Sequence, residues 1–375
     1  MKKVLFVATV VQKHINVFHL PFLKQFQANG YKTYVAASND TEQPKVEIPY
    51  CDEYVEIKFK RNPFHPSNIP AFFKLRKLIR SNRFDIIHCH TPVGGVLGRL
   101  ASIGSKKKGM KVYYTAHGFH FYKGAPLKNW LLYYPIEKLC SYFTDVLLTI
   151  NLEDYDLAKR KMKAKKVEYT PGVGIDLSRF ATEVDRKAKR EEIGVPEDAF
   201  LLLSVGEVNE NKNHKVIVQA LAKLNDPSIH YAIAGIGPEK DRLLALADQL
   251  GVGEQLHLLG YRKDVPQLNR ISDVFCFPSQ REGLGLAAIE AMSCGLPIVT
   301  SDIRGINDYS IDGVTGYKCA PTDAESFAKA IATLKNNSDL RMTMGAHNVV
   351  SAQKYDIREI LPQMKEIYQL QELGE

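Results

Sequence analysis

The sequence predicts an α/β protein made of two similar domains, each containing a parallel β-sheet with helices on both faces. Two observations support this fold class. Apolar runs of strand length alternate with amphipathic stretches of helical length along most of the chain, and a segment rich in proline and glycine at 170–176 interrupts the alternation near its middle. A chain of 375 residues is also long enough for two hydrophobic cores.

Five apolar runs in the first half predict parallel strands, and four amphipathic stretches between them predict helices. The predicted strands are residues 4–10, 31–37, 85–89, 111–116 and 146–149, and the predicted helices are residues 17–29, 70–81, 96–102 and 130–143. The first run follows two lysines and resembles a short signal peptide. Because it has the length of a strand and no small-residue cleavage site follows it, we expect it to be the first strand.

The second half repeats this alternation after the predicted hinge at 170–176. The predicted strands are residues 199–206, 231–235, 256–259, 274–278 and 297–300, with a short helix at 287–293 and an amphipathic helix at 357–370. The pattern therefore predicts a first domain at 1–172, a second domain at 173–354 and a final helical segment at 355–375.

The composition excludes several classes of protein. Hydrophobic residues make up 45% and charged residues 25% of the chain, as in ordinary globular proteins. The six cysteines include no Cys-x2-Cys pair, so neither a disulfide framework nor a cysteine-based zinc site is expected, and a reducing cytoplasm fits best. No apolar run reaches the roughly 18 residues that suggest a membrane-spanning helix.

Positive charge is concentrated in the first half of the chain. Residues 1–172 contain 28 Lys and Arg against 13 Asp and Glu, a net charge of +15, whereas residues 173–375 contain 22 against 29, a net charge of −7. Basic clusters lie at 74–83, 106–108 and 159–166. Such clusters are often simply solvated, but no nucleic-acid-binding motif accompanies them, and the first interleaves apolar residues at helical spacing. A membrane surface is therefore the expected partner.

The segment Arg281–Met292 carries the clearest functional motif. Glu282 and Glu290 are eight residues apart around a predicted helix start, and Gly283 and Gly285 lie at the preceding turn. Small residues at a positive helix end leave backbone N–H groups open to a diphosphate, and two carboxylates could hold separate sets of hydroxyls. This is the shape of a nucleotide-sugar. The alternative without function is that Glu282 caps the helix and Glu290 is solvated.

This stretch resembles the Glu-x7-Glu signature of retaining family-four glycosyltransferases. The resemblance implies the GT-B fold, in which two Rossmann-like domains face each other across a cleft and a C-terminal helix returns to the first domain. It also implies that Glu282 positions the donor sugar and that Glu290 holds the ribose. The diphosphate would be bound by the backbone amides of Gly283, Leu284, Gly285 and Leu286.

The start of the second domain supports the resemblance in part. The family presents an arginine directly after a glycine and a lysine five residues later; here Gly206 is followed by Glu207, and Lys212 matches the lysine. A fixed cation there would stabilise the departing diphosphate. Because Glu207 departs from the pattern, either another cation, Arg262 or Arg304, compensates, or Glu207 marks a subfamily with altered contacts.

Two further turns resemble the family. Gly235-x-Gly237-Pro238 matches its Gly-x-Gly-Pro turn, and the segment with Tyr261 and Arg262 resembles the loop that cradles the base. Gly235-x-Gly237 lacks the third glycine of a dinucleotide fingerprint, so the turn argues little for NAD.

In the first domain, Thr115-x-His117-Gly118 follows a predicted strand and resembles the family motif whose histidine meets the donor sugar. His14 and Asn16, in the first loop, are candidate acceptor or donor contacts, as is Arg304. His88-x-His90 ends another strand but has no third ligand nearby in the sequence, so no metal is predicted.

These expectations combine into a retaining, metal-independent hexosyltransferase without a cofactor. It would use a nucleoside-diphosphate sugar, by family frequency a UDP-sugar, and a lipid-linked glycan acceptor in bacterial exopolysaccharide, capsule or lipopolysaccharide assembly. It would be cytoplasmic and peripheral at the inner face of the plasma membrane, with no nucleic-acid partner. The rivals are a sugar-nucleotide epimerase of the same fold and a non-catalytic nucleotide-sugar sensor.

Overall fold

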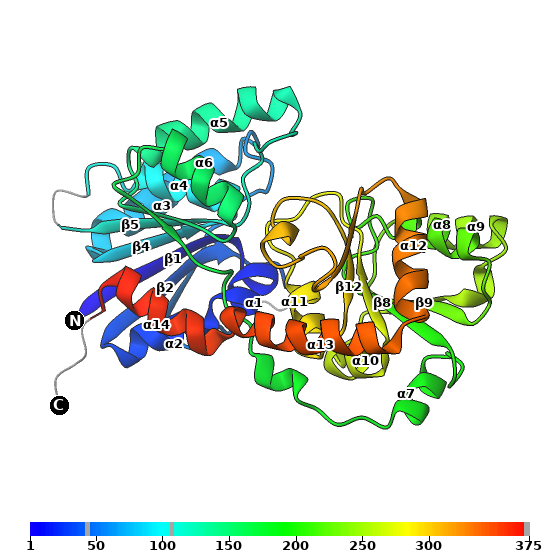
Figure 1. The fold of residues 1–375 in the computed structure, drawn as a ribbon. Helices are drawn as coiled ribbons and strands as arrows, with labels where there is room; N and C mark the ends of the chain where they lie inside the picture. Colours follow the sequence, from blue (N-terminus) through cyan, green and yellow to red (C-terminus); the bar gives the residue numbers. More distant parts are fainter. Residues whose placement is uncertain (42–45, 106–108, 371–375) are drawn as a thin grey trace. The chain divides into compact units, whose positions relative to one another are not determined.

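A computed structural model describes residues 1–41, 46–105 and 109–370 (Figure 1). The chain divides into two compact units. Unit 1 comprises Met1–Gly174 and the segment that begins at Ile357, and unit 2 comprises Ile175–Asp356. The predicted boundary after residue 172 lies two residues before this division. The basic run predicted at 106–108 lies outside the described residues.

Unit 1 is built on a seven-stranded sheet in which every pair of neighbouring strands is parallel. In spatial order its strands are β3 (Glu53–Glu56), β2 (Tyr31–Ser38), β1 (Lys2–Val10), β4 (Ile86–His90), β5 (Lys111–Ala116), β6 (Val146–Thr149) and β7 (Lys166–Tyr169). The central strands read as continuous apolar runs because helices cover both of their faces.

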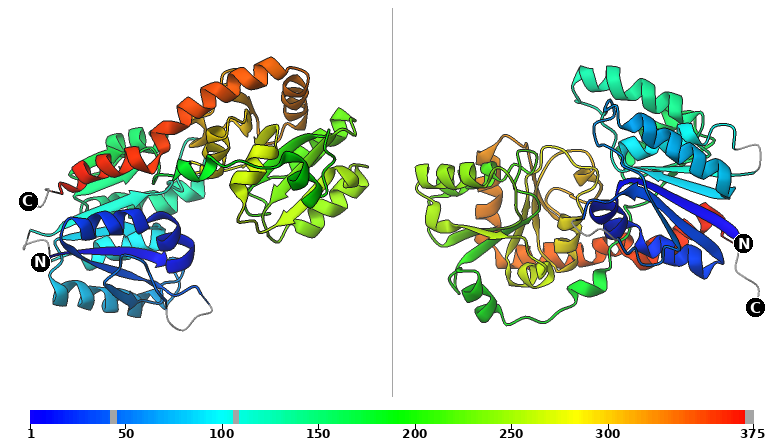
Figure 2. Two further views of the ribbon diagram at one scale, coloured as in Figure 1. Left: turned by 90° about the horizontal axis from the view of Figure 1, so that it is seen from below. Right: turned by 180° about the vertical axis from the view of Figure 1, so that it is seen from behind.

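Alternate side chains of β1 show how the two faces are covered. Leu5 and Val7 share a buried cluster with residues of α3, α4, α5 and α6, whereas the ring of Phe6 packs against Phe26 of α2 on the other face. Figures 1 and 2 show α3, α4 and α5 on one side of this sheet and α2 and α14 on the other. The helical segments of unit 1 are η1 (Val11–Ile15, a π-helical turn), α1 (Asn16–Phe18), α2 (Leu20–Ala28), α3 (Asn68–Asn82), α4 (Pro92–Ala101), α5 (Leu127–Ser141), α6 (Leu152–Lys161) and α14 (Ile357–Tyr368).

Helix α14 follows unit 2 in the chain but packs within unit 1. Its buried face presents Met364 and Tyr368, and the side-chain amide of Gln25 in α2 donates a 2.8 Å hydrogen bond to the carbonyl of Leu361. The Tyr368 hydroxyl lies 2.6 Å from Nδ1 of His88. The prediction that a C-terminal helix returns to the first domain is therefore confirmed.

Unit 2 contains a six-stranded sheet, also with parallel pairs throughout. In spatial order its strands are β10 (Leu256–Gly260), β9 (Ile229–Ala234), β8 (Phe200–Val205), β11 (Val274–Phe277), β12 (Ile298–Ser301) and β13 (Gly316–Cys319). Its helices are η3 (Leu177–Phe180), α7 (Arg186–Glu192), α8 (Lys215–Leu224), α9 (Lys240–Gln249), η4 (Gly253–Gln255), α10 (Val265–Ile271), α11 (Leu286–Ser293), η5 (Ile306–Asp308), α12 (Ala324–Lys335), α13 (Ser338–Ala352) and η6 (Gln353–Tyr355).

The predicted fold class is confirmed, but three strands were not predicted. These are β3, β7 and β13, and each lies at the edge of its sheet. Edge strands are short and only partly buried, so they carry no continuous apolar run that would identify them in the sequence. Within the described part of the chain, no helix combines the length and the apolarity that a membrane crossing would need.

Candidate functional site

The turn between β11 and α11 is packed so closely that glycine is required at one position in the turn and at one position in a neighbouring loop. Gly285 has a φ of +90°, and a Cβ there would lie 2.4 Å from the ring of Phe277. Gly305, from the loop after β12, has a φ of +80°, and a Cβ there would lie 2.5 Å from the carbonyl oxygen of Gly283. The turn is therefore held by backbone contacts, with its first helical N–H groups at the start of α11.

Two residues predicted to act on the donor meet at this turn. The Nζ of Lys212, in the loop between β8 and α8, lies 2.7 Å from Oε1 of Glu282, and the two side chains are only 21% and 14% exposed. The same ammonium group lies 4.7 Å from the centre of the Phe277 ring. A fixed cation and a fixed carboxylate, 70 residues apart in the sequence, thus form one ion pair.

Further hydrogen bonds join the same two loops. The backbone N–H of Gln280 donates to the carbonyl of Asn211 at 2.8 Å, and the Asn211 side chain donates to the carbonyl of Arg281 at 3.0 Å. Gly206 packs against the Lys212 side chain, since a Cβ there would lie 3.2 Å from Cε. The position of Lys212 is therefore set by both loops.

Glu290 lies within α11, the helix that contacts η3. Burial raises the pKa of Glu290 from 4.5 to about 7, and Arg179 in η3 opposes this shift. A carboxyl group with such a pKa exists in both protonation states near neutral pH, so it can donate as well as accept hydrogen bonds with a sugar hydroxyl.

The Gly-x-Gly-Pro turn has a packing explanation. A Cβ on Gly235 would lie 1.7 Å from the carbonyl oxygen of Gly206, and a Cβ on Gly237 would lie 2.2 Å from that of Val208. These glycines let the backbones of the loops after β8 and β9 come into contact. This packing alone explains why both positions are glycine. Glu207, in the slot where the family has arginine, is exposed.

The two arginines considered as replacements for that arginine lie in different surroundings. Arg262 contacts Glu192 and donates to Asp264 at 2.8 Å, and it lowers the pKa of Asp264 to about 2. Its charge is therefore already balanced by two carboxylates. Arg304 is buried, at 8% exposure, and precedes Gly305, which touches the backbone of Glu282 and Gly283. Arg304 is therefore not a loop cation open to solvent. Tyr261, by contrast, is 72% exposed.

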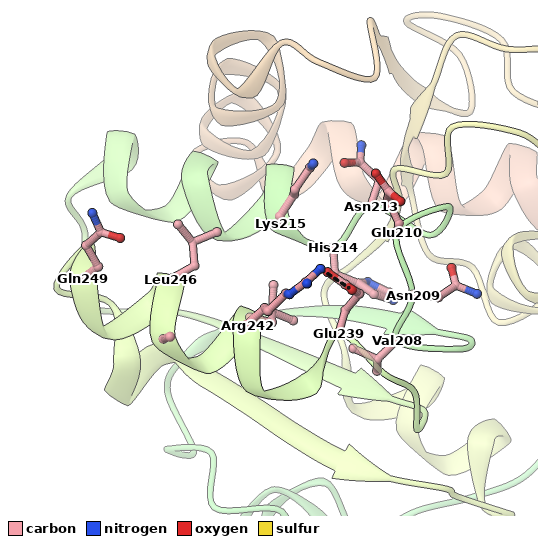
Figure 3. A pocket seen from close by; sticks show the side chains of 12 residues that line it. Val208, Asn209, Glu210, Asn213, His214, Lys215, Glu239, Arg242, Leu246 and Gln249 are labelled. Atoms are coloured by element: carbon pink, nitrogen blue, oxygen red, sulfur yellow. Dashed lines mark hydrogen bonds and ion pairs between the residues drawn. The ribbon is translucent and has the colours of Figure 1, made fainter.

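A cavity of about 490 Å³ lies between α8 and α9 and borders the β8–α8 loop (Figure 3). The Glu239–Arg242 ion pair, at 3.0 Å, forms part of its wall. Its lining is Val208, Asn209, Glu210, Asn213, His214, Lys215, Glu239, Arg242, Leu243, Ala245, Leu246 and Gln249. Among the described residues, this lining does not include Lys212, Glu282 or Glu290, so the cavity is not the predicted donor site.

In unit 1, His117 follows β5 and borders a mainly apolar cavity of about 310 Å³. Burial lowers the pKa of His117 to about 4, so the ring is neutral at physiological pH. The cavity is lined by Pro63, Phe64, Thr91, Pro92, Val96, Tyr114, His117, Gly118, Phe119, His120, Phe121, Tyr133, Ile136 and Glu137.

His14 and His117, predicted separately from the sequence, lie together in unit 1. Their ring centres are 4.8 Å apart. His14 belongs to the π-helical turn after β1 and is 8% exposed, while Asn16, which follows it, donates to the side chain of Gln12 at 3.0 Å. Sequence reasoning missed that His19 and His90 join this group. The available signal for His90 was its position at the carboxyl end of β4, whereas His19 lies beyond η1 and α1 at the start of α2 and has no such signal.

Comparison with known proteins identifies both halves of the chain. Residues 185–348 match the family model described as "Glycosyl transferases group 1", and residues 3–151 match the model described as "Glycosyl transferase 4-like". Over 372 residues the chain is 39% identical to the putative glycosyltransferase EpsD of Bacillus subtilis, covering 98% of this chain and 96% of that protein.

More distant relatives agree. An Escherichia coli enzyme, UDP-Gal:alpha-D-GlcNAc-diphosphoundecaprenol alpha-1,3-galactosyltransferase, is 27% identical, with 85% of each chain covered. The crystal structure of Anabaena Alr3699/HepE in complex with UDP and glucose superposes with a TM-score of 0.79 at 20% identity, covering 98% of this chain and all of that one. The chain therefore belongs to the glycosyltransferases that these two models, group 1 and 4-like, describe, and it has the GT-B fold.

Proposed function

We propose that this protein is a retaining glycosyltransferase that moves a sugar from a UDP-sugar to a hydroxyl group of a lipid-linked glycan. The observation that carries the proposal is the ion pair between Lys212 and Glu282 at the glycine turn before α11. The pair supports the proposal because a cation can stabilise a departing diphosphate, a carboxylate can orient sugar hydroxyls, and the nearby helix N–H groups favour phosphate oxygens.

In the proposed reaction, the bond between the anomeric carbon and the diphosphate oxygen breaks while the acceptor oxygen bonds to the same face of that carbon. The acceptor proton passes to an oxygen of the leaving diphosphate. Lys212 stabilises the charge that develops on this group, Glu282 orients sugar hydroxyls, and Glu290 holds the ribose. His117 contacts the sugar. In the family pattern, the arginine after the glycine and the lysine five residues later both provide positive charge. In this proposal, Lys212 supplies that charge here.

The choice of donor rests on similarity. The E. coli relative is named for UDP-Gal, and the HepE structure contains UDP and glucose. A UDP-sugar is therefore the donor we propose. The E. coli relative is also named for a diphosphoundecaprenol acceptor, which favours a lipid-linked acceptor in bacterial polysaccharide assembly.

The surface of α5 supports an acceptor held at a membrane. Five exposed apolar residues follow one another at intervals of three or four along this helix, so they form one stripe. They are Leu127, Leu131, Pro135, Leu139 and Tyr142. Leu127 and Leu131 are more than 70% exposed, and Lys128 and Lys138 lie beside the stripe. An exposed apolar stripe with flanking lysines suits the interface of an anionic membrane.

Helix α3 adds to this surface. Ile69 and Phe73 are each 62% exposed, and the basic residues Lys74, Lys77 and Arg80 are exposed on the same helix. The other apolar residues of the basic cluster behave differently, because Leu75 and Ile79 pack into the core of unit 1. The peripheral position at the inner face of the plasma membrane is thus proposed from α5 together with α3.

The experiment measures nucleotide release from UDP-, GDP- and ADP-sugars, with and without bacterial lipid extract. It compares the wild type with Glu282→Ala and with Glu325→Ala, a matched control in α12 whose exposed carboxylate pairs only with Lys223 and Lys329 among the ion pairs of the described residues. We expect extract-dependent release of UDP in the wild type and the control, and its loss in Glu282→Ala.

Other outcomes would replace the proposal. Conversion of the donor to another sugar-nucleotide without extract would indicate the epimerase. Tight donor binding without any release or conversion would indicate the non-catalytic sensor.

A further inference from the structure

Four imidazole rings from three segments converge in unit 1. His14 and His19 follow β1, His90 ends β4, and His117 follows β5. One ring nitrogen from each residue lies within 4.8 Å of one from each of the others. We infer that these four histidines bind a divalent transition-metal ion, for which Zn²⁺ is the natural probe. The inference shares His117 with the proposed transfer reaction, but metal binding needs no donor and can be measured without one.

The spacing of the nitrogens is close to that of a tetrahedral site. Nε2 of His14 lies 3.1 Å from Nε2 of His19, and Nε2 of His117 lies 3.4 Å from Nδ1 of His90. In a tetrahedral zinc site with Zn–N bonds of about 2.0–2.1 Å, the ligand nitrogens are about 3.3 Å apart. Two edges of the tetrahedron therefore already have this length, and rotation of the rings must shorten the longer separations.

The hydrogen bonding of the cluster is incomplete without a further partner. Nδ1 of His19 and Nε2 of His90 are buried and have no hydrogen-bond partner among the described residues, and each of these residues is 1% exposed. A neutral imidazole has one N–H donor and one acceptor nitrogen. Whichever tautomer His19 and His90 adopt, one buried polar nitrogen on each ring is left over. These nitrogens are not the ones in the short contacts, so each can carry the ring proton while Nε2 of His19 and Nδ1 of His90 present lone pairs to a cation.

The charge state and the ligand type define the metal class. Burial lowers the pKa of each of the four imidazoles, which favours the uncharged form that binds metal ions. No carboxylate belongs to the cluster as far as the described residues go. Imidazole nitrogens suit Zn²⁺, Cu²⁺ and Ni²⁺, whereas Mg²⁺ and Ca²⁺ require oxygen ligands.

A fifth histidine, His88, lies next to the cluster but is not one of the proposed ligands. The ring of His88 lies 4.0 Å from that of His90, but its two nitrogens are occupied. Nδ1 contacts the hydroxyl of Tyr368 at 2.6 Å and Nε2 contacts that of Thr115 at 2.8 Å. The sequence argued against a metal because His88-x-His90 had no third ligand nearby. The fold instead supplies three partners for His90 from other segments.

The test uses the full chain without a polyhistidine tag, freed of metal by a chelator. After addition of Zn²⁺ and removal of unbound ion, elemental analysis should find one equivalent. Addition of Co²⁺ should give the intense visible absorption of a tetrahedral cobalt centre. Both signals should be lost, with affinity at least tenfold weaker, in His19→Gln and in His14→Asn.

His257→Gln is the matched control, because His257 and His230 form a two-histidine contact of 2.8 Å in unit 2. This variant should bind metal like the wild type. Zn²⁺ should raise the thermal midpoint of the wild type and of His257→Gln but not of His14→Asn. If His19→Gln fails to fold by circular dichroism, His14→Asn decides, since His14 lies in the turn after β1 and is less completely buried than His19. Absence of bound metal in the wild type, or unchanged binding in His14→Asn, overturns the inference.

Discussion

The carboxyl group of Glu290 is the residue whose chemistry depends most on its surroundings. Its pKa is about 7 in the folded protein, compared with an ordinary value of 4.5. Between these values the folded state keeps a proton that the unfolded chain has released. Since stability falls with rising pH wherever the folded state binds more protons, the free energy of unfolding should decrease between about pH 4.5 and pH 7 because of this group.

Replacing Glu290 by Gln removes this titration while keeping the shape. We expect the Gln variant to be more stable than the wild type above pH 7, by up to about 3 kcal/mol, with the difference shrinking as the pH falls toward 4.5. Urea unfolding of both proteins at a series of pH values measures the difference. Stability curves that run parallel from pH 5 to pH 8 would show that Glu290 titrates normally.

Among single residues, the sequence predicted those that belong to short motifs. Lys212, Glu282 and Gly285 were found from motifs within one turn each. The ion pair between Lys212 and Glu282 was not predicted, because a contact between two loops depends on which strands are neighbours. Strands β8 and β11 lie side by side only in the folded sheet. For the same reason the sequence could not predict that Arg262 is balanced by Glu192 or that four histidines meet.

Among the elements, α4 shows most clearly how packing overrides local pattern. The sequence predicted a helix at 96–102, but α4 begins at Pro92 and contains three glycines. Two of them are required by the sheet below: a Cβ on Gly95 would lie 2.4 Å from the Tyr114 ring, and a Cβ on Gly98 would lie 2.4 Å from Sγ of Cys89. Glycine weakens a helix in isolation, so the sequence concealed the first turn.

The contact below α4 can be tested by a double-mutant cycle. Gly98→Ala should lower the free energy of unfolding by about 1–3 kcal/mol through overpacking, although alanine is the better helix former by about 1 kcal/mol. Combining it with Cys89→Ala, which removes the clashing sulfur, should cost less than the sum of the two single changes. Urea unfolding gives all three values. Strict additivity would mean that the helix relieves the clash by moving.

The same reasoning explains which strands and helices were predictable. Central strands such as β1 and β8 are mostly buried and carry continuous apolar runs, whereas β3, β7 and β13 belong to sheet edges and are mixed in polarity. Helix α5 has apolar residues both against the core and on its exposed side, so its hydrophobic pattern alone did not reveal that one face is open to solvent.

For the whole molecule, the uneven charge and the exposed α5 stripe lead to a prediction of membrane binding. Vesicles containing anionic lipid should carry the protein in flotation experiments, and added salt should weaken the association. Leu131→Glu combined with Leu139→Glu should reduce the bound fraction at least tenfold, because two apolar contacts are replaced by negative charges.

A matched control exists in unit 2. Met342 and Val350 of α13 are 66% and 73% exposed and are also eight residues apart on one helix. Changing both to Glu should leave flotation unchanged. Equal losses in the two double variants would indicate a general effect of negative charge, and unaltered binding after the α5 change would remove α5 from the membrane surface.

The two-domain organisation could be predicted because each sheet requires its own set of apolar strands, and the segment at 170–176 separates the two sets. The order of strands within each sheet could not, since all the strands pair in parallel and their composition does not say which central strands are neighbours. The structure supplies that order, and with it the positions where loops from distant parts of the sequence meet.

The placement of α14 has a consequence for synthesis on the ribosome. Unit 2 is complete in the emerging chain once Asp356 has left the exit tunnel. Unit 1 then still lacks α14, whose Tyr368 packs against Phe26 and contacts His88 through its hydroxyl group. The domain translated first is thus the last to be finished, and the side of its sheet that α2 and α14 cover stays only partly covered while the entire second domain is made.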